Sequence, residues 1–442
     1  MPISLPQARA FWLRQASVPA SSILHPAFSP KAGGDRLVRT AILVAEGKIA
    51  QLVPESTTLA DGLPQVDLSG KIVLPRFVDI HTHLDKGHIL GRAPNPDGTF
   101  FGALTTVAAD REANWSADDV RARMDFALRC ALHHGTGAVR THLDSLGKQS
   151  GISWPVFNEM RQEWKGRVAL QASALFPLSA VWDDPAEFRN ILAHIVKYEG
   201  ILGAVTFRGD PMTAAVDHAL DEMIDAAEAN GLELDFHVDE SASPDARSLE
   251  KVADAVLRKR FKGRVLVGHC CSLALMGDED RLRVIEKLAE AQVGVVSLPM
   301  CNMYLQDRQS GRTPRWRGVA PLHELDAAGV TTMVASDNTR DPFYAYGDLD
   351  CVEVFREATR ILQFDHGDRP WLETLLTRPA NYMGLPSHGR LILGESANMV
   401  VFSARTLNEW LCRPQADRLV LIEGKASQTT MPDFAELDSL SA

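Results

Sequence analysis

The chain has 442 residues, of which 45% are hydrophobic and 23% are charged, a composition typical of a folded globular protein. That length is too great for one ordinary compact domain and suits a large barrel with a small second domain. The 46 Lys and Arg residues against 57 Asp and Glu give a net charge of −11. An acidic surface argues against nucleic acid as a partner, because phosphate binding requires a basic face.

Targeting signals and disulfides are not indicated. The N-terminal segment has no continuous apolar core of the kind that a signal peptide needs. No apolar run reaches the roughly 18 to 20 residues that span a bilayer. The six cysteines are scattered and form no CxxC pair, so we interpret them as reduced thiols. We therefore expect a soluble, cytoplasmic protein without a membrane partner.

Both ends of the chain are rich in short β segments. Residues 39–53 predict a hairpin that turns at Glu46-Gly47, and residues 397–402 and 418–424 predict further strands near the C-terminus. Two β-rich ends around a different middle indicate that residues 1–70 and 389–442 pair into one small β-sandwich domain. Residues 71–388 then form a second domain.

The middle of the chain alternates short apolar runs with amphipathic helical stretches, such as residues 117–134 and 214–230. Several runs are almost continuously apolar, as strands buried on both faces should be. Eight strands with helices between them predict an α/β fold of the (β/α)8 TIM-barrel type. A doubly wound open sheet is the alternative, but no GxGxxG follows the first strand. The eight runs are residues 72–83, 138–144, 168–177, 202–208, 232–240, 265–271, 293–299 and 331–338.

Four of these strands end in side chains that bind metals or carry protons. They are His81 and His83 on the first, His237 and Glu240 on the fifth, His269 on the sixth and Asp337 on the eighth. His81 and His83 share a face because alternate residues of a strand do. An Asp at the end of an apolar strand is costly to bury unless it is paired or bound to metal. Since the ends of barrel strands meet at one mouth, we expect these residues to lie together.

Imidazoles and a carboxylate in such a cluster can hold a divalent ion with an open position for water. The ion lowers the pKa of that water toward neutrality. Asp337 can accept the proton of the water, Glu240 can shuttle protons near the leaving nitrogen, and His269 can orient the attacking water. The pattern predicts a metal-dependent hydrolase.

The motifs resemble the amidohydrolase superfamily, and within it the cytosine deaminase-like branch, over nearly the whole chain. They comprise His81-Thr-His-Leu-Asp85, Val139-Arg-Thr-His-Leu-Asp144, Phe236-His-Val-Asp-Glu240, Gly268-His269, Asn302 with Leu305-Gln-Asp-Arg308, and Ser336-Asp337 with Asp341-Pro342.

The resemblance implies one divalent ion per chain, zinc or iron with manganese as an alternative. Its ligands would be His81, His83, His237 and Asp337. The resemblance also implies that Glu240 protonates a ring nitrogen of the substrate. The fourth strand lacks the lysine that bridges two metals in many members, which favours a single ion.

Departures from the family pattern concern the substrate. Leu178 stands where cytosine deaminases carry Gln, Asn338 where they carry a second Asp, and Phe343 where they carry Trp. We expect these three residues, with His142 at the end of the second strand, to contact the substrate. A Leu offers no amide to a pyrimidine edge, so the hydrogen bonds that read cytosine are incomplete.

The expected activity is deamination, releasing ammonia from an exocyclic amino or imino group. The expected substrate is a cytosine-like pyrimidine or a related cyclic amidine such as isocytosine or creatinine. The alternatives are a ring-opening amidohydrolase acting on a cyclic amide, and an inactive barrel that serves as a binding protein. The expected partners are a small heterocycle and further copies of the chain in a homo-oligomer.

Two sets of loop residues are open to two interpretations each. The charges are either solvated or touch a substrate group: Arg308, Arg315 and Arg317. The aromatic residues either cap the pocket or pack locally: Phe100, Phe101 and Trp316.

Overall fold

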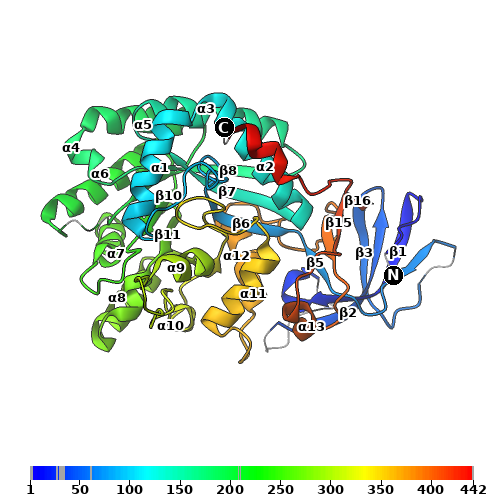
Figure 1. The fold of residues 1–442 in the computed structure, drawn as a ribbon. Helices are drawn as coiled ribbons and strands as arrows, with labels where there is room; N and C mark the ends of the chain where they lie inside the picture. Colours follow the sequence, from blue (N-terminus) through cyan, green and yellow to red (C-terminus); the bar gives the residue numbers. More distant parts are fainter. Residues whose placement is uncertain are drawn as a thin grey trace. The chain divides into compact units, whose positions relative to one another are not determined.

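The computed structural model describes residues 3–25, 28, 35–59, 62–207, 209 and 211–440. Contacts between Cα atoms divide the chain into two compact units (Figure 1). The first unit comprises Met1–Asp79, Arg129–Ala138 and Asp350–Met431, and the second comprises Ile80–Leu128, Val139–Leu349 and Pro432–Ala442. Boundaries at residues 71 and 388 stay a prediction. Within the described ranges, no helix is both long and apolar enough to cross a membrane.

The first unit contains two four-stranded sheets that share one hydrophobic core. The core joins N-terminal residues such as Leu13 and Val44 to C-terminal residues such as Met399 and Leu421. The predicted β-sandwich formed by the two ends is therefore confirmed. One sheet has the order β3-β2-β1-β4, with β1 Ala10–Pro19, β2 Leu37–Ala45, β3 Lys48–Pro54 and β4 Gln65–Asp67. The other has the order β16-β15-β14-β5, with β5 Val73–Pro75, β14 Met399–Val401, β15 Leu419–Ile422 and β16 Lys425–Ala426.

The predicted hairpin is the antiparallel pair of β2 and β3. Glu46 and Gly47 both have positive φ, 49° and 77°, as a two-residue turn that follows the twist of the strands requires. Helices α11 (Cys351–Leu362), α12 (Thr377–Tyr382) and α13 (Leu407–Cys412) also belong to this unit.

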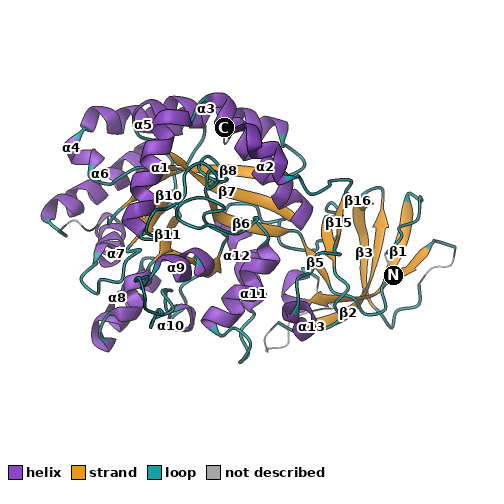
Figure 2. Cartoon of the chain, viewed as in Figure 1, coloured by secondary structure: helices purple, strands orange, loops and turns teal. Residues whose placement is uncertain are grey.

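Eight strands close into the predicted (β/α)8 barrel. They are β6 Phe77–Thr82, β7 Thr136–Asp144, β8 Ala169–Leu175, β9 Leu202–Val205, β10 Leu234–Val238, β11 Val265–His269, β12 Gly294–Ser297 and β13 Thr332–Val334. Strands β9 to β13 form one parallel sheet, and β6 to β8 form a second sheet with three strands. Parallel bridges Ser173↔Ile201 and Thr82↔Asp337 join the two sheets at both seams. Figure 2 shows these strands surrounded by helices.

Helices follow most of the barrel strands, and α2 and α6 have the bounds that the sequence predicted. The helices are α1 Phe100–Asn114, α2 Ala117–His134, α3 Ser150–Glu163, α4 Ala180–Asp183, α5 Pro185–Lys197, α6 Ala214–Asn230, α7 Ser248–Lys259, α8 Asp278–Glu290, α9 Pro299–Leu305 and α10 Leu322–Ala327.

One predicted strand, residues 72–83, is two strands, and treating it as one was wrong. Strand β5 pairs with β14 in the small sandwich, whereas β6 belongs to the barrel. The division falls at Pro75-Arg76, where proline has no N–H to continue a ladder. Arg208, the end of another predicted run, lies outside the described residues.

A buried ion pair lies inside the barrel, two residues before His142 and His237 on the same strands. Arg140 on β7 donates through Nη1 to Asp235 Oδ2 on β10 at 3.0 Å. His142 and His237 follow these residues by two positions and therefore share their inward face. The pair compensates the charge of Asp235, whose pKa burial raises to about 6.

Candidate metal centre and active site

The strand ends bring the predicted ligands into one cluster. His81 lies on β6, His237 on β10, and His83 and Asp337 lie just beyond the ends of β6 and β13. The Asp337 backbone N–H donates to the His81 carbonyl at 2.8 Å, which fixes the carboxylate beside the first strand. Asp337 has φ of 67° and His269 has φ of 71°, both in the region that non-glycine residues rarely adopt. Such strain is typical of functional sites.

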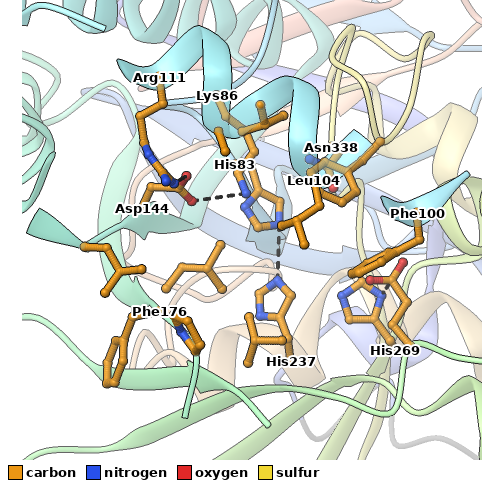
Figure 3. Close-up of a pocket in the computed structure, with 18 of the residues that line it drawn as sticks. His83, Lys86, Phe100, Leu104, Arg111, Asp144, Phe176, His237, His269 and Asn338 are labelled. Carbon is orange, nitrogen blue, oxygen red and sulfur yellow. Dashed lines mark hydrogen bonds and ion pairs between the residues drawn. The ribbon is translucent and has the colours of Figure 1, made fainter. Parts of the chain in front are cut away.

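The distances between ligand atoms are short. Asp337 Oδ1 lies 3.0 Å from His83 Nε2 and 3.4 Å from His81 Nε2. His237 Nε2 lies 3.3 Å from His83 Nε2, and Figure 3 shows these two rings pointing toward one another. Donor atoms of His81, His269 and Asp337 lie within 4.8 Å of one another, as do those of His81, His142 and His237.

A small residue makes room for this cluster. A Cβ on Gly268 would lie 2.9 Å from Cε1 of the His81 ring, too close for any side chain. Glycine at this position therefore lets β11 approach His81 and brings His269 beside it. Packing against His81 therefore explains why glycine precedes His269 in the Gly268-His269 dipeptide.

The donor set fits a divalent ion. Both ring nitrogens of His81 and of His142 are buried without a hydrogen-bond partner among the described residues. Burial lowers the pKa of His83 to about 4 and holds the pKa of His237 well below its ordinary value, so both rings are neutral, as metal ligands must be. Burial raises the pKa of Asp337, but the adjacent His81 and His83 outweigh it and keep this carboxylate ionised. Neutral imidazoles with one carboxylate suit zinc or iron.

Glu240 lies beside this cluster, on a turn that is held in place. The preceding residue, Asp239, accepts hydrogen bonds from the backbone N–H groups of Ser248 and Leu249 at the start of α7. The Glu240 side chain is 13% exposed, and its Oε1 lies 3.5 Å from His269 Nδ1. Burial and the charge of Asp337 raise the pKa of Glu240 well above its ordinary value. Glu240 therefore holds its proton to a higher pH than an ordinary Glu, which suits a role as an acid.

A cavity of about 290 Å³ opens over the cluster, a size near the lower end of the range for small-molecule sites. One side of the cavity carries the groups that can bind a metal or transfer protons, which are the His83, His237 and His269 rings and the Glu240 carboxyl group. Much of the remaining wall is apolar, and it includes four phenylalanines: Phe100, Phe176, Phe207 and Phe343. Such a cavity suits a flat heterocycle whose reactive edge faces the histidines.

Residues 180–425 match the family model described as the amidohydrolase family. The chain is 51% identical over 438 residues to a pterin deaminase of Rhizobium rhizogenes, covering 99% of this chain and 98% of that protein. The chain belongs to the amidohydrolase family. The predicted resemblance is confirmed, and with it the class of hydrolytic enzymes that act on C–N bonds.

A further sequence relative and a solved structure are similar to this amidohydrolase over most of its length, and the solved structure supports the fold. An N-isopropylammelide isopropyl amidohydrolase of Pseudomonas sp. is 24% identical over 402 residues, 88% of this chain and 90% of that protein. The crystal structure of 5-methylcytosine deaminase from Klebsiella pneumoniae, liganded with 5-fluorocytosine, superposes with a TM-score of 0.80. It is 21% identical and covers 96% of this chain and 98% of that one.

Two of the four residues predicted to contact the substrate line the cavity, and two do not. Asn338 and Phe343 line the cavity, and Asn338 Nδ2 donates to Asp341 Oδ2 at 2.6 Å. Leu178 is 2% exposed and is not among the lining residues; its N–H donates to the Val205 carbonyl. His142 is fully buried among the predicted ligands and not in the cavity wall.

Of the loop residues with two interpretations, one lines the cavity and the others do not. Phe100 lines the cavity, whereas Phe101 is 62% exposed. Trp316 is half-buried and is not among the lining residues, and neither are Arg308, Arg315 and Arg317. The Arg308 guanidinium stacks 4.2 Å from the centre of the Tyr304 ring, a local contact.

Sequence reasoning gave no role in the site to Lys86, Arg111 or Asp144, which are charged residues of the cavity wall, although Asp144 ends one of the family motifs. Lys86 Nζ lies 3.2 Å from Asp144 Oδ1, and Arg111 Nη1 donates to Asp144 Oδ2 at 2.8 Å. Lys86 directly follows the His81-to-Asp85 motif and Asp144 ends a predicted strand, so position alone could have indicated both. Arg111 lies on α1 and gave no such signal. The two cations on one carboxylate form a polar edge beside the apolar wall (Figure 3).

Proposed function

We propose that this amidohydrolase deaminates the 2-amino-4-oxo ring of a pterin, releasing ammonia. The observation that carries the proposal is the 51% identity to a pterin deaminase over almost the full length of both chains. A pterin is an isocytosine ring fused to a pyrazine, so its reactive half is one of the cyclic amidines that the sequence predicts. The second ring fits the phenylalanine-lined wall of the cavity.

A divalent ion, zinc or iron with manganese as an alternative, would be held by His81, His83, His237 and Asp337. When bound, it would supply a water of lowered pKa. Asp337, ionised and buried, is placed to take the proton of the attacking water. Glu240, which lines the cavity and whose pKa is raised by burial, is placed to donate to a ring nitrogen.

In the overall reaction the water oxygen bonds to C2, the bond from C2 to the amino nitrogen breaks, and ammonia leaves. The 2-amino group becomes an oxo group while the ring stays closed. His269, whose ring is neutral because burial lowers its pKa to about 3, is placed to orient the water. The Phe343 and Phe100 rings, whose centres lie 5.5 Å apart, line the cavity and limit the access of bulk water.

The substrate is tested by measuring ammonia release from pterin, isocytosine and cytosine with zinc-, iron- and manganese-loaded protein. We expect kcat/KM for pterin to exceed that for isocytosine by at least about 10-fold, the effect of losing apolar contacts in a pocket. Isocytosine is the matched control because it has the same reactive edge without the second ring.

Equal or higher kcat/KM for cytosine would contradict the pterin proposal and favour a pyrimidine. A ring-opened product without ammonia would contradict deamination itself and favour hydrolysis of a cyclic amide. Absorbance spectra of the products distinguish the closed ring from the opened one.

A further inference from the structure

Asn302 is a fully buried amide at the centre of the candidate acid–base groups. It lies on α9, the short helix that follows β12, and its backbone N–H donates to the Leu298 carbonyl at 2.9 Å. Gly318, with φ of 76°, lets the following loop lie against it: a Cβ there would be 3.0 Å from the Asn302 carbonyl oxygen. The backbone on both sides therefore fixes the position of the side chain.

The amide nitrogen of Asn302 contacts two groups at once. Its Nδ2 lies 2.8 Å from His269 Nδ1 and 3.2 Å from Glu240 Oε1. An amide nitrogen has two hydrogens to donate and no lone pair to accept with. With the amide nitrogen on this side, His269 Nδ1 is the acceptor, and the proton of the neutral ring is then on Nε2.

We propose that Asn302 is a positioning residue that holds His269 in the Nε2–H tautomer and keeps Glu240 beside it. His269 Nε2 is buried and has no hydrogen-bond partner among the described residues, which leaves it free for a water or a substrate oxygen. In this tautomer Nε2 donates a hydrogen bond and cannot accept a proton. The inference rests on the proposed function at one point: the water's proton then goes to Asp337, and His269 only orients the water.

Loss of the amide opens a competing contact. His269 Nδ1 and Glu240 Oε1 are only 3.5 Å apart, so without Asn302 between them the imidazole can donate directly to the carboxyl group. That exchange places the proton on Nδ1 and turns Nε2 into an acceptor. Both groups then present the wrong atom to the substrate, although neither is removed.

The kinetic test replaces Asn302 by Leu, which has a similar volume and no donor. We expect Asn302→Leu to keep its metal content and KM within about 3-fold while kcat falls by about 10- to 100-fold, as for other supporting residues of an active site. In Glu240→Gln/Asn302→Leu the loss should be no greater than in Glu240→Gln alone, because the two residues act as a unit. Met303→Ala, on the same helix and 44% exposed, is the matched control. Multiplying losses would contradict the proposal and indicate a structural role.

A second readout does not depend on activity. Histidine-selective 15N NMR, with His269 assigned by its absence in His269→Gln, reports which ring nitrogen carries the proton. We expect protonated Nε2 in the parent protein and a changed tautomer in Asn302→Leu; an unchanged tautomer in that variant would overturn the proposal. A parent protein that releases no ammonia from pterin refutes the proposed function instead, and the NMR result then decides the role of Asn302.

Discussion

Glu240→Gln is expected to keep its metal and to lower kcat for ammonia release by about 10²- to 10⁴-fold, the contribution of a positioned general acid. Gln has nearly the same shape and still accepts the hydrogen bond from Asn302 Nδ2, so the site should keep its geometry. It cannot give a proton to a ring nitrogen. Steady-state kinetics with elemental analysis of the same sample separate the two effects.

The dependence of kcat on pH tests whether Glu240 acts as an acid. Because burial and the charge of Asp337 raise the pKa of Glu240, its acid form persists to a higher pH than that of an ordinary Glu. kcat should fall as the pH rises through that pKa, and this alkaline limb should vanish in Glu240→Gln. Glu279→Gln, an exposed residue on α8, is the matched control. Unchanged turnover in Glu240→Gln would remove Glu240 from the mechanism.

His237→Ala is expected to lower the metal content from about one ion per chain to a small fraction of that, and turnover with it. His237 Nε2 is 3.3 Å from His83 Nε2, and the substitution takes away one of the four proposed ligand side chains. The melting temperature should also lose its dependence on added metal, because an ion that binds only the folded state stabilises it. Elemental analysis and thermal melts with and without a chelator measure both.

The matched control is His218→Ala, which removes an exposed histidine on α6. It should keep the metal, the activity and the melting temperature of the parent. Full metal occupancy in His237→Ala would contradict a ligand role for His237. The cation would then have to be held by the group that contains His81, His269 and Asp337.

The barrel was predictable because buried parallel strands appear in the sequence as short apolar runs with a regular spacing. Each of the eight runs overlaps a barrel strand, and polar residues mark where several of them end. The run at residues 72–83 did not reveal the boundary between two strands, because the apolar residues before and after Pro75 belong to different sheets. Periodicity cannot show which sheet a strand joins, since that depends on contacts distant in sequence.

Parts of the candidate site could not be predicted for the same reason. His81, His83 and His237 lie at strand ends, where position alone indicated their shared location. Asn302 lies on a short helix after a strand, and its contacts with His269 and Glu240 depend on how that helix turns back. The family pattern pointed to Leu178, yet the cavity wall contains Phe176 and Pro177.

Anomalous diffraction from crystals of the zinc-loaded protein, at wavelengths on both sides of the zinc edge, locates the cation directly. One peak per chain within bonding distance of His81, His83, His237 and Asp337 is the expected result, with ligand distances of about 2.0–2.2 Å. A fully loaded crystal with no peak among these side chains, or with its peak elsewhere, would contradict the role given to them.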